Sequence, residues 1–132
     1  ALRYTLLRGD ALPPIPRKVM VIFCADHGVV AEGVSAYPQA VTGQMAANFV
    51  AGGAAISVLC RQFGIEPLIV DAGINGLAPP GVRAAKIAPG TANFADRPAM
   101  TRDQAMQSVA LGIQIAREHP GAILGAGEMG IG

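Results

Sequence analysis

The chain has 132 residues, of which 52% are hydrophobic and only 14% are charged, and its formal net charge is +1. This length suits one domain, and the near-neutral charge excludes the basic surface that nucleic-acid binding requires. No apolar run is long enough to cross a membrane and no signal peptide opens the chain, so we expect a cytoplasmic protein that binds neither nucleic acid nor membrane.

The low charge content also bears on what surrounds the chain. Ordinary globular chains carry about a quarter charged residues, whereas a domain of this size must expose much of its surface. We therefore expect part of this surface to be covered, either by further sequence of a longer protein or by a partner subunit.

The first predicted elements are the end of a helix over residues 1–8 and a proline-rich crossing over residues 13–16. We assign residues 1–15 to the end of an N-terminal helical segment and a linker, and residues 16–132 to the first part of an α/β domain. A continuous apolar, β-branched run over residues 19–24 predicts a strand buried on both faces, as in parallel sheets.

The middle of the chain predicts a helix and then a second strand. Residues 41–61 favour a helix in two pieces, because Gly52 and Gly53 interrupt it. Gly64 is typical of the residue that ends a helix. Residues 67–70 predict a strand, with Asp71 just past its end.

The last third of the chain predicts a short strand over residues 84–88, a helix from Thr101 to about Glu118 and a final strand over residues 122–126. Thr101 and Gln104 fit a capping box. The apolar residues of this helix on one stripe, as expected of a helix that packs on a core, are Ala105, Val109, Ile113 and Ala116. This alternation predicts an α/β fold: a three-layer, Rossmann-like parallel sheet with helices on both faces.

Two cysteines, Cys24 and Cys60, lie in apolar runs without the spacing of a metal site. We expect both to be buried free thiols in a reducing compartment. We expect no metal.

Asp26 and His27 follow the first strand directly, with Gly28 after them. Ligands bind at the carboxyl edge of open parallel sheets, so this acid and imidazole are candidates for orienting a substrate. The alternative is structural: Asp26 caps the following turn and His27 packs beside it. Asp71 is a weaker candidate, because an acid is common where a strand ends.

Tyr37, Pro38 and Met45 are candidates for the wall of the same site. The tyrosine ring suits a pocket for a flat ring, but it could equally pack over the neighbouring helix. A single methionine is more often a core residue than a ligand contact.

Residues 127–132 (GEMGIG) predict a binding loop after the last strand, because glycines let the backbone approach an anion closely. Glu128 would repel a phosphate, so we expect it to meet a neutral or cationic part of a substrate. The alternative is an acid that bonds to nearby backbone N–H groups.

Several familiar enzyme motifs are absent. Ser35, His27 and Asp26 could form a triad on paper, but no Gly-x-Ser-x-Gly elbow accompanies them. Neither a Walker loop nor a Gly-x-Gly-x-x-Gly fingerprint occurs at a strand-to-helix turn.

The chain nevertheless resembles one family in several separated blocks. It is similar to the nicotinate-nucleotide–dimethylbenzimidazole phosphoribosyltransferases in residues 25–30 (ADHGVV), 32–38 (EGVSAYP), 41–42 (VT), 48–49 (NF), 52–56 (GGAAI), 90–94 (GTANF), 98–101 (PAMT) and 127–132 (GEMGIG). The resemblance covers nearly all of the chain from Pro16 onward.

The resemblance implies an enzyme that transfers phosphoribose from nicotinate mononucleotide to 5,6-dimethylbenzimidazole, giving α-ribazole phosphate and nicotinate for the lower ligand of cobalamin. It implies a parallel α/β domain with a small helical domain, a homodimer, and no metal or organic cofactor. Family members are considerably longer than this chain. Their proposed catalytic base, a glutamate, lies beyond residue 132, so the resemblance assigns no catalytic residue here and these residues alone are expected to be inactive.

By motif, the resemblance places Tyr37, Pro38 and Met45 near the benzimidazole pocket. It places Glu128, Met129 and Gly130 in the loop that meets the ribose phosphate and the base. With Asp26, His27 and Gly132, these are the expected substrate-binding residues. Two alternatives remain: a non-catalytic module that binds a nucleotide or base, and a nucleotide-binding α/β domain of unrelated activity.

Overall fold

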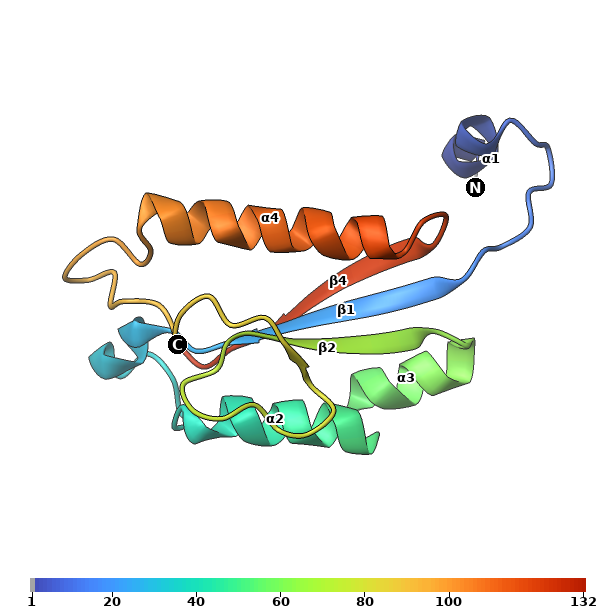
Figure 1. Ribbon diagram of the computed structural model, residues 1–132. Coiled ribbons are helices and arrows are strands. Elements are labelled where there is room, and N and C mark those ends of the chain that lie inside the picture. The colour runs from blue at the N-terminus through green and yellow to red at the C-terminus, as the bar shows by residue number, and fades with distance from the viewer. Residues whose placement is uncertain (1) are drawn as a thin grey trace.

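A parallel four-stranded sheet with helices on both faces forms the protein (Figure 1), in a computed structural model that describes residues 2–132. The strands are β1 (Lys18–Ala25), β2 (Glu66–Gly73), β3 (Arg83–Ala84) and β4 (Ile123–Met129), in the order β3-β2-β1-β4. The helices are α1 (Leu2–Arg8), the 3-10 helix η1 (Gly28–Glu32), α2 (Ala40–Ala51), α3 (Ala55–Phe63) and α4 (Arg102–Glu118). The predicted three-layer α/β fold is confirmed.

β1 is the central element, because it pairs with β2 on one side and with β4 on the other. Its side chains alternate between the two faces of the sheet. Val19 and Val21 pack with Ile115 of α4, whereas Ile22 packs with Phe49 of α2. Figure 1 shows α2 and α3 covering one face and α4 covering the other. This double burial explains the unbroken apolar run of the strand.

The helix pair α2 and α3 is interrupted at Gly52, as predicted. Gly52 adopts a left-handed conformation with φ of 82° and donates its N–H to the carbonyls of Asn48 and Phe49. Such a glycine ends a helix without steric cost. Gly64 ends α3 in the same way, with φ of 58°.

From the sequence we expect no stretch long enough to cross a membrane, but residues Ala40–Phe63 meet that criterion by length and composition alone, with a mean hydropathy of 1.3 over the most apolar window. The break at Gly52 divides this stretch into two helices. Ala46 and Phe49 are buried in the core beside β1. Helices that cover a sheet in this way are apolar for that reason.

α4 begins with the predicted capping box, in which Thr101 Oγ1 accepts from the Gln104 N–H and Gln104 Oε1 accepts from the Thr101 N–H. The predicted core stripe of this helix is wrong, however. Val109 is 58% exposed and Ile113 is 48% exposed, whereas Ile115 is 2% exposed.

The face of α4 that packs on the sheet runs through Gln104, Ser108, Leu111 and Ile115, at helical spacing. Two of these residues are polar, and the Ser108 hydroxyl satisfies itself by donating to the Gln104 carbonyl at 3.0 Å. The most apolar stripe of α4 is therefore not its buried face. Part of the buried face is polar, and its polar groups form hydrogen bonds within the helix.

β2 and β4 extend beyond their predicted ends. Asp71 lies within β2, opposite Cys24, rather than after the strand. Glu128 and Met129 lie within β4, not in a loop. β1 offers ladder hydrogen bonds along its whole length, and this pairing overrides the low strand propensity of glycine and acidic residues. β3, in contrast, is shorter than predicted.

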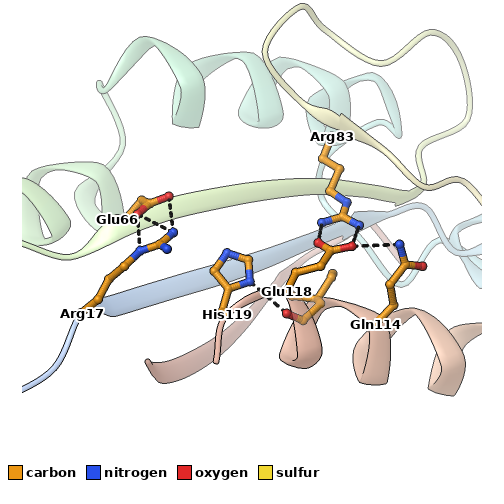
Figure 2. Close-up of polar contacts among 7 residues, drawn as sticks. Arg17, Glu66, Arg83, Gln114, Glu118 and His119 are labelled. Carbon is orange, nitrogen blue, oxygen red and sulfur yellow. Dashed lines mark hydrogen bonds and ion pairs between the residues drawn. The ribbon is translucent and has the colours of Figure 1, made fainter. Parts of the chain in front are cut away.

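Two ion pairs tie the sheet to itself and to α4 (Figure 2). Arg83 of β3 forms a two-pronged hydrogen-bonded pair with Glu118 of α4, which also accepts from Gln114 Nε2 at 2.9 Å. Arg17 and Glu66 pair at the start of β1 and β2, but both side chains are more than half exposed. Exposed pairs contribute little.

The Arg83 pair predicts a stability that depends on pH. Hydrogen bonding to Arg83, then to Gln114, lowers the pKa of Glu118 from 4.5 to about 2. A carboxyl with a lower pKa in the folded state stabilises the protein above its ordinary pKa, and this contribution is lost as the pH falls from 4.5 towards 2. Glu118→Gln should therefore lower the free energy of unfolding at pH 6 more than at pH 2, as measured by urea denaturation.

Glu66→Gln provides the control, because it breaks the exposed Arg17 pair and should change little at either pH. An equal loss for Glu118→Gln at both pH values would contradict the assignment.

Candidate functional site

Four chain segments converge where β1 ends. Asp26 donates its N–H to the Gly73 carbonyl at 3.0 Å, and His27 donates its N–H to the Ile131 carbonyl at 3.1 Å. From the loop before α4, Thr91 donates its N–H to the Asp26 carbonyl at 3.0 Å. The C-terminal residues of the chain therefore lie at the carboxyl edge of the sheet, beside η1 (Figure 1). This is the edge where the sequence predicted a ligand site.

Glycines make this convergence possible. A Cβ atom on Gly28 would lie 2.5 Å from the Asn93 nitrogen, and one on Gly130 would lie 2.3 Å from the Ala25 carbonyl oxygen and 2.7 Å from His27 Nε2. These distances are far inside van der Waals contact, and two of the three atoms belong to the backbone. Only glycine fits at either position.

The Asp26 carboxylate is buried and fully paired. The residue is 1% exposed, its Oδ1 accepts from the Thr42 hydroxyl at 2.6 Å, and its Oδ2 accepts from the Asn75 N–H at 2.7 Å. It thus joins the end of β1 to the first turn of α2 and to the loop after β2. This geometry favours the structural interpretation of Asp26 over direct contact with a substrate.

Thr42 is a residue of this edge to which the sequence pattern assigned no role. It is 0% exposed, and its Oγ1 also accepts from the Ile131 N–H at 3.2 Å. The sequence did contain a signal for this role. Thr42 lies at helical spacing from Ala46 and Phe49, which are apolar, so its hydroxyl falls on the buried face of α2. A buried hydroxyl needs a partner, and here it has two.

His27 lines a small cavity of about 120 Å³ between the sheet edge and α4. Its ring lies against Gly130 and its carbonyl accepts from Gln39 Nε2 at 3.1 Å. The other residues of the cavity are mostly small or apolar, with Met100 and Ser108 from the α4 side. The imidazole is thus held at the edge, half-buried, with a void beside it.

A larger apolar groove of about 370 Å³ lies on the α2 and α3 side of β4. Met45 and Phe49 of α2 line it, together with Met20, Ile22, Ala54, Ala55, Ile56, Gly127 and Glu128. Apolar concavities of this kind suit flat, uncharged rings. Met45, which the resemblance places near the benzimidazole pocket, is among the residues that line this groove.

Tyr37, Pro38 and Met129 lie around this groove without lining it. Tyr37 is 64% exposed and Pro38 is also exposed, on the loop before α2. Met129 packs against the core on the α2 side, whereas Glu128 is exposed and in register with Phe23, which packs on the α4 side. Strand alternation therefore directs the Glu128 side chain to the opposite face of the sheet from Met45.

The remaining buried acid, Asp71, is held rigidly. Its Oδ1 accepts from the Ile74 N–H at 2.8 Å and its Oδ2 lies 3.4 Å from Lys86 Nζ. Burial and then the charge of Asp71 raise the pKa of the Cys24 thiol to about 11, so this cysteine stays protonated at neutral pH. Residues 2–132 contain no cluster of His, Cys, Asp and Glu suited to a metal ion.

The crowding at Gly28 gives a prediction about stability. Gly28→Ala should lower the free energy of unfolding by about 1–3 kcal/mol, because the added methyl group meets only backbone atoms. Gly112→Ala is the matched control: a Cβ there meets nothing within 4 Å in α4, so the change should stabilise by about 0.5–1 kcal/mol. Urea denaturation measures both, and equal effects would refute the close approach.

Comparison with known proteins identifies close relatives of this chain. The model of a family described as phosphoribosyltransferase matches residues 1–132. The nicotinate-nucleotide–dimethylbenzimidazole phosphoribosyltransferase of Pseudomonas fluorescens is 54% identical over 137 residues, covering 100% of this chain and 39% of that protein. The enzyme of the same name from Cupriavidus taiwanensis is 48% identical, covering 99% of this chain and 39% of its own length.

The fold has a close match among solved structures as well. The crystal structure of the nicotinate-nucleotide–dimethylbenzimidazole phosphoribosyltransferase from Thermus thermophilus superposes with a TM-score of 0.93 at 47% sequence identity, over 100% of this chain and 42% of that one. The chain thus spans about two fifths of the length of the relatives that it matches.

Proposed function

The chain belongs to the phosphoribosyltransferase family whose model matches it throughout, and from this premise we propose that it forms part of an enzyme that transfers phosphoribose from nicotinate mononucleotide to 5,6-dimethylbenzimidazole. The products are α-ribazole phosphate, for the lower ligand of cobalamin, and nicotinate. The observation that carries the proposal is the apolar groove lined by Met45 and Phe49, which opens next to the glycine-rich edge of the sheet.

The acceptor occupies this groove in the proposed complex. Dimethylbenzimidazole is flat and largely apolar, so the Met45 thioether and the Phe49 ring supply dispersion contacts to its faces. Tyr37 and Pro38, exposed on the loop before α2, close over the ring in the proposed complex.

The donor binds along residues 130–132. In the proposed complex, backbone N–H groups of this segment bind the phosphate, and Gly130 and Gly132 let the segment pack closely against His27. Glu128 lies at the end of β4, two residues before Gly130, and in the proposed complex its carboxylate meets a neutral part of the donor, such as a ribose hydroxyl. Met129 fixes this strand end by packing in the core.

The reaction is a displacement at that carbon. A ring nitrogen of the acceptor forms the new bond with its lone pair, while the bond to nicotinate breaks and its electron pair leaves on the pyridine nitrogen. The proton of the acceptor's other nitrogen goes to a base, which the resemblance places outside these 132 residues. No cofactor takes part.

The proposed assembly is a cytoplasmic homodimer. Met106, Val109 and Ile113 form an exposed apolar stripe on α4, which supports cover by another part of the enzyme or by a second subunit. The free, buried thiols of Cys24 and Cys60 suit a reducing compartment. α1 has no buried residue, in keeping with our proposal that residues 1–15 belong to a separate helical domain.

The test uses a full-length enzyme that carries these 132 residues, made if necessary by placing them in the matched region of the Cupriavidus taiwanensis relative. It should form α-ribazole phosphate from the two substrates, as followed by chromatography. Met45→Ala should raise the KM for dimethylbenzimidazole about tenfold, because it removes apolar contact with the ring, and leave the KM for nicotinate mononucleotide unchanged.

Leu77→Ala is the control, since this apolar side chain is 96% exposed on the loop after β2 and lines none of the cavities described. Its KM values should equal those of the parent enzyme. Binding of both substrates without product would favour the non-catalytic alternative, and an unchanged acceptor KM in Met45→Ala would move the acceptor out of this groove.

A further inference from the structure

We propose that Thr42 and Asp26 are positioning residues: their buried hydrogen-bonded link to Ile131 sets the conformation in which residues 130–132 bind the phosphate-bearing substrate. This inference rests on the proposed function, because it concerns how the donor site is held. It assigns a role to two side chains that neither touch solvent nor line the groove.

The direction of each hydrogen bond in the link is fixed by chemistry. An ionised carboxylate only accepts, and a hydroxyl has one proton to donate. The Thr42 proton is therefore committed to Asp26 Oδ1, at a distance of 2.6 Å. The oxygen of Thr42 then presents its lone pairs to the Ile131 N–H, 3.2 Å away. The hydroxyl cannot rotate to donate elsewhere without abandoning a buried charge.

The carboxylate at the start of the link is itself anchored. Its second oxygen accepts from the Asn75 N–H at 2.7 Å, and the Asn75 side chain donates to Gln39 Oε1 at 3.2 Å. The loop after β2 and the start of α2 therefore hold Asp26 from two directions. Because the Asp26 carboxylate is held in place, the Thr42 hydroxyl that donates to it is held as well. That hydroxyl in turn fixes the Ile131 N–H that it accepts from.

The two peptide groups on either side of the Ile131 Cα are both held. Its N–H donates to Thr42 and its carbonyl accepts from the His27 N–H at 3.1 Å. Within residues 2–132, Thr42 provides the only side-chain hydrogen bond to residues 130–132. Gly130 and Gly132 flank Ile131 and pack against His27. Each glycine shares one of the two held peptide planes with Ile131, so the orientation of both follows from these two hydrogen bonds.

The hydroxyl of Thr42 can be removed without changing the shape of the side chain. Thr42 lies on the inner face of α2 with Ala46 and Phe49, where valine would have the same shape. Valine would leave one carboxylate oxygen and the Ile131 N–H without a partner. The helix would keep its packing and the terminal segment would lose its tether.

The experiment compares Thr42→Val with Thr42→Ser in the full-length enzyme that carries these residues. Thr42→Val should raise the KM for nicotinate mononucleotide about tenfold or more, because a hydrogen bond linked to a charged group is lost. The KM for dimethylbenzimidazole should change by less than about twofold. Thr42→Ser keeps the hydroxyl and should restore most of the donor affinity.

Ser57→Ala separates positioning from stability. Ser57 is also a buried hydroxyl, 6% exposed, and it donates to the Phe49 carbonyl at 3.0 Å, away from residues 130–132. It should lower Tm without raising the donor KM. If Ser57→Ala raises that KM as much as Thr42→Val does, or if Thr42→Val leaves it unchanged, the positioning role is overturned.

Hydrogen exchange gives a readout that does not require turnover. Thr42→Val should speed amide exchange at Ile131, measured by NMR, more than at Ile115 in the α4 core. Ser57→Ala should not speed exchange at Ile131 more than at Ile115. Unchanged relative exchange at Ile131 overturns the link itself. A parent enzyme without turnover refutes the proposed function alone, since the exchange experiment still reports on the link.

Discussion

The parallel pairing of β1 with both β2 and β4 is the constraint on which the rest of the structure depends. Because parallel strands bring their carboxyl ends to one edge, this pairing alone places Asp26, the end of β2 and residues 130–132 together. The edge is too crowded for side chains at Gly28 and Gly130. Backbone therefore meets backbone there, and polar contacts rather than apolar packing hold the segments in place.

The sequence predicts the elements whose signals are local and fails where a neighbouring strand decides the outcome. The apolar run of β1, the capping box of Thr101 and the break at Gly52 depend on residues close together in the chain. The ends of β2 and β4 do not depend on local residues alone, because pairing with β1 imposes strand structure on acidic and glycine residues there. The inner face of α4 was missed because two of its residues are polar and are bonded within the helix: Ser108 donates to the Gln104 backbone carbonyl, and the Gln104 side chain accepts from the Thr101 N–H.

The same distinction applies to the candidate site. Asp26 and His27 follow a strand, so their place at the sheet edge was predictable. The link from Thr42 to Ile131 joins residues 89 positions apart and has no counterpart in local pattern. The direction of the Glu128 side chain could also be assigned only from the register of β4 on β1, because a shift of one residue moves a side chain to the other face of the sheet. The candidate site thus has an apolar groove on one face of the sheet, the Glu128 side chain directed to the other face, and the hydrogen-bonded residues Asp26, Thr42 and Ile131 between them.

β4 is an edge strand among residues 2–132, since it pairs with β1 alone. Its outer backbone groups have no ladder partner, and its middle residues, Gly125, Ala126 and Gly127, carry no charge that would repel another chain. An unprotected edge of this kind is a template for non-native strand addition. These 132 residues expressed by themselves would therefore tend to self-associate into insoluble material, and solubility would return with whatever sequence covers that edge.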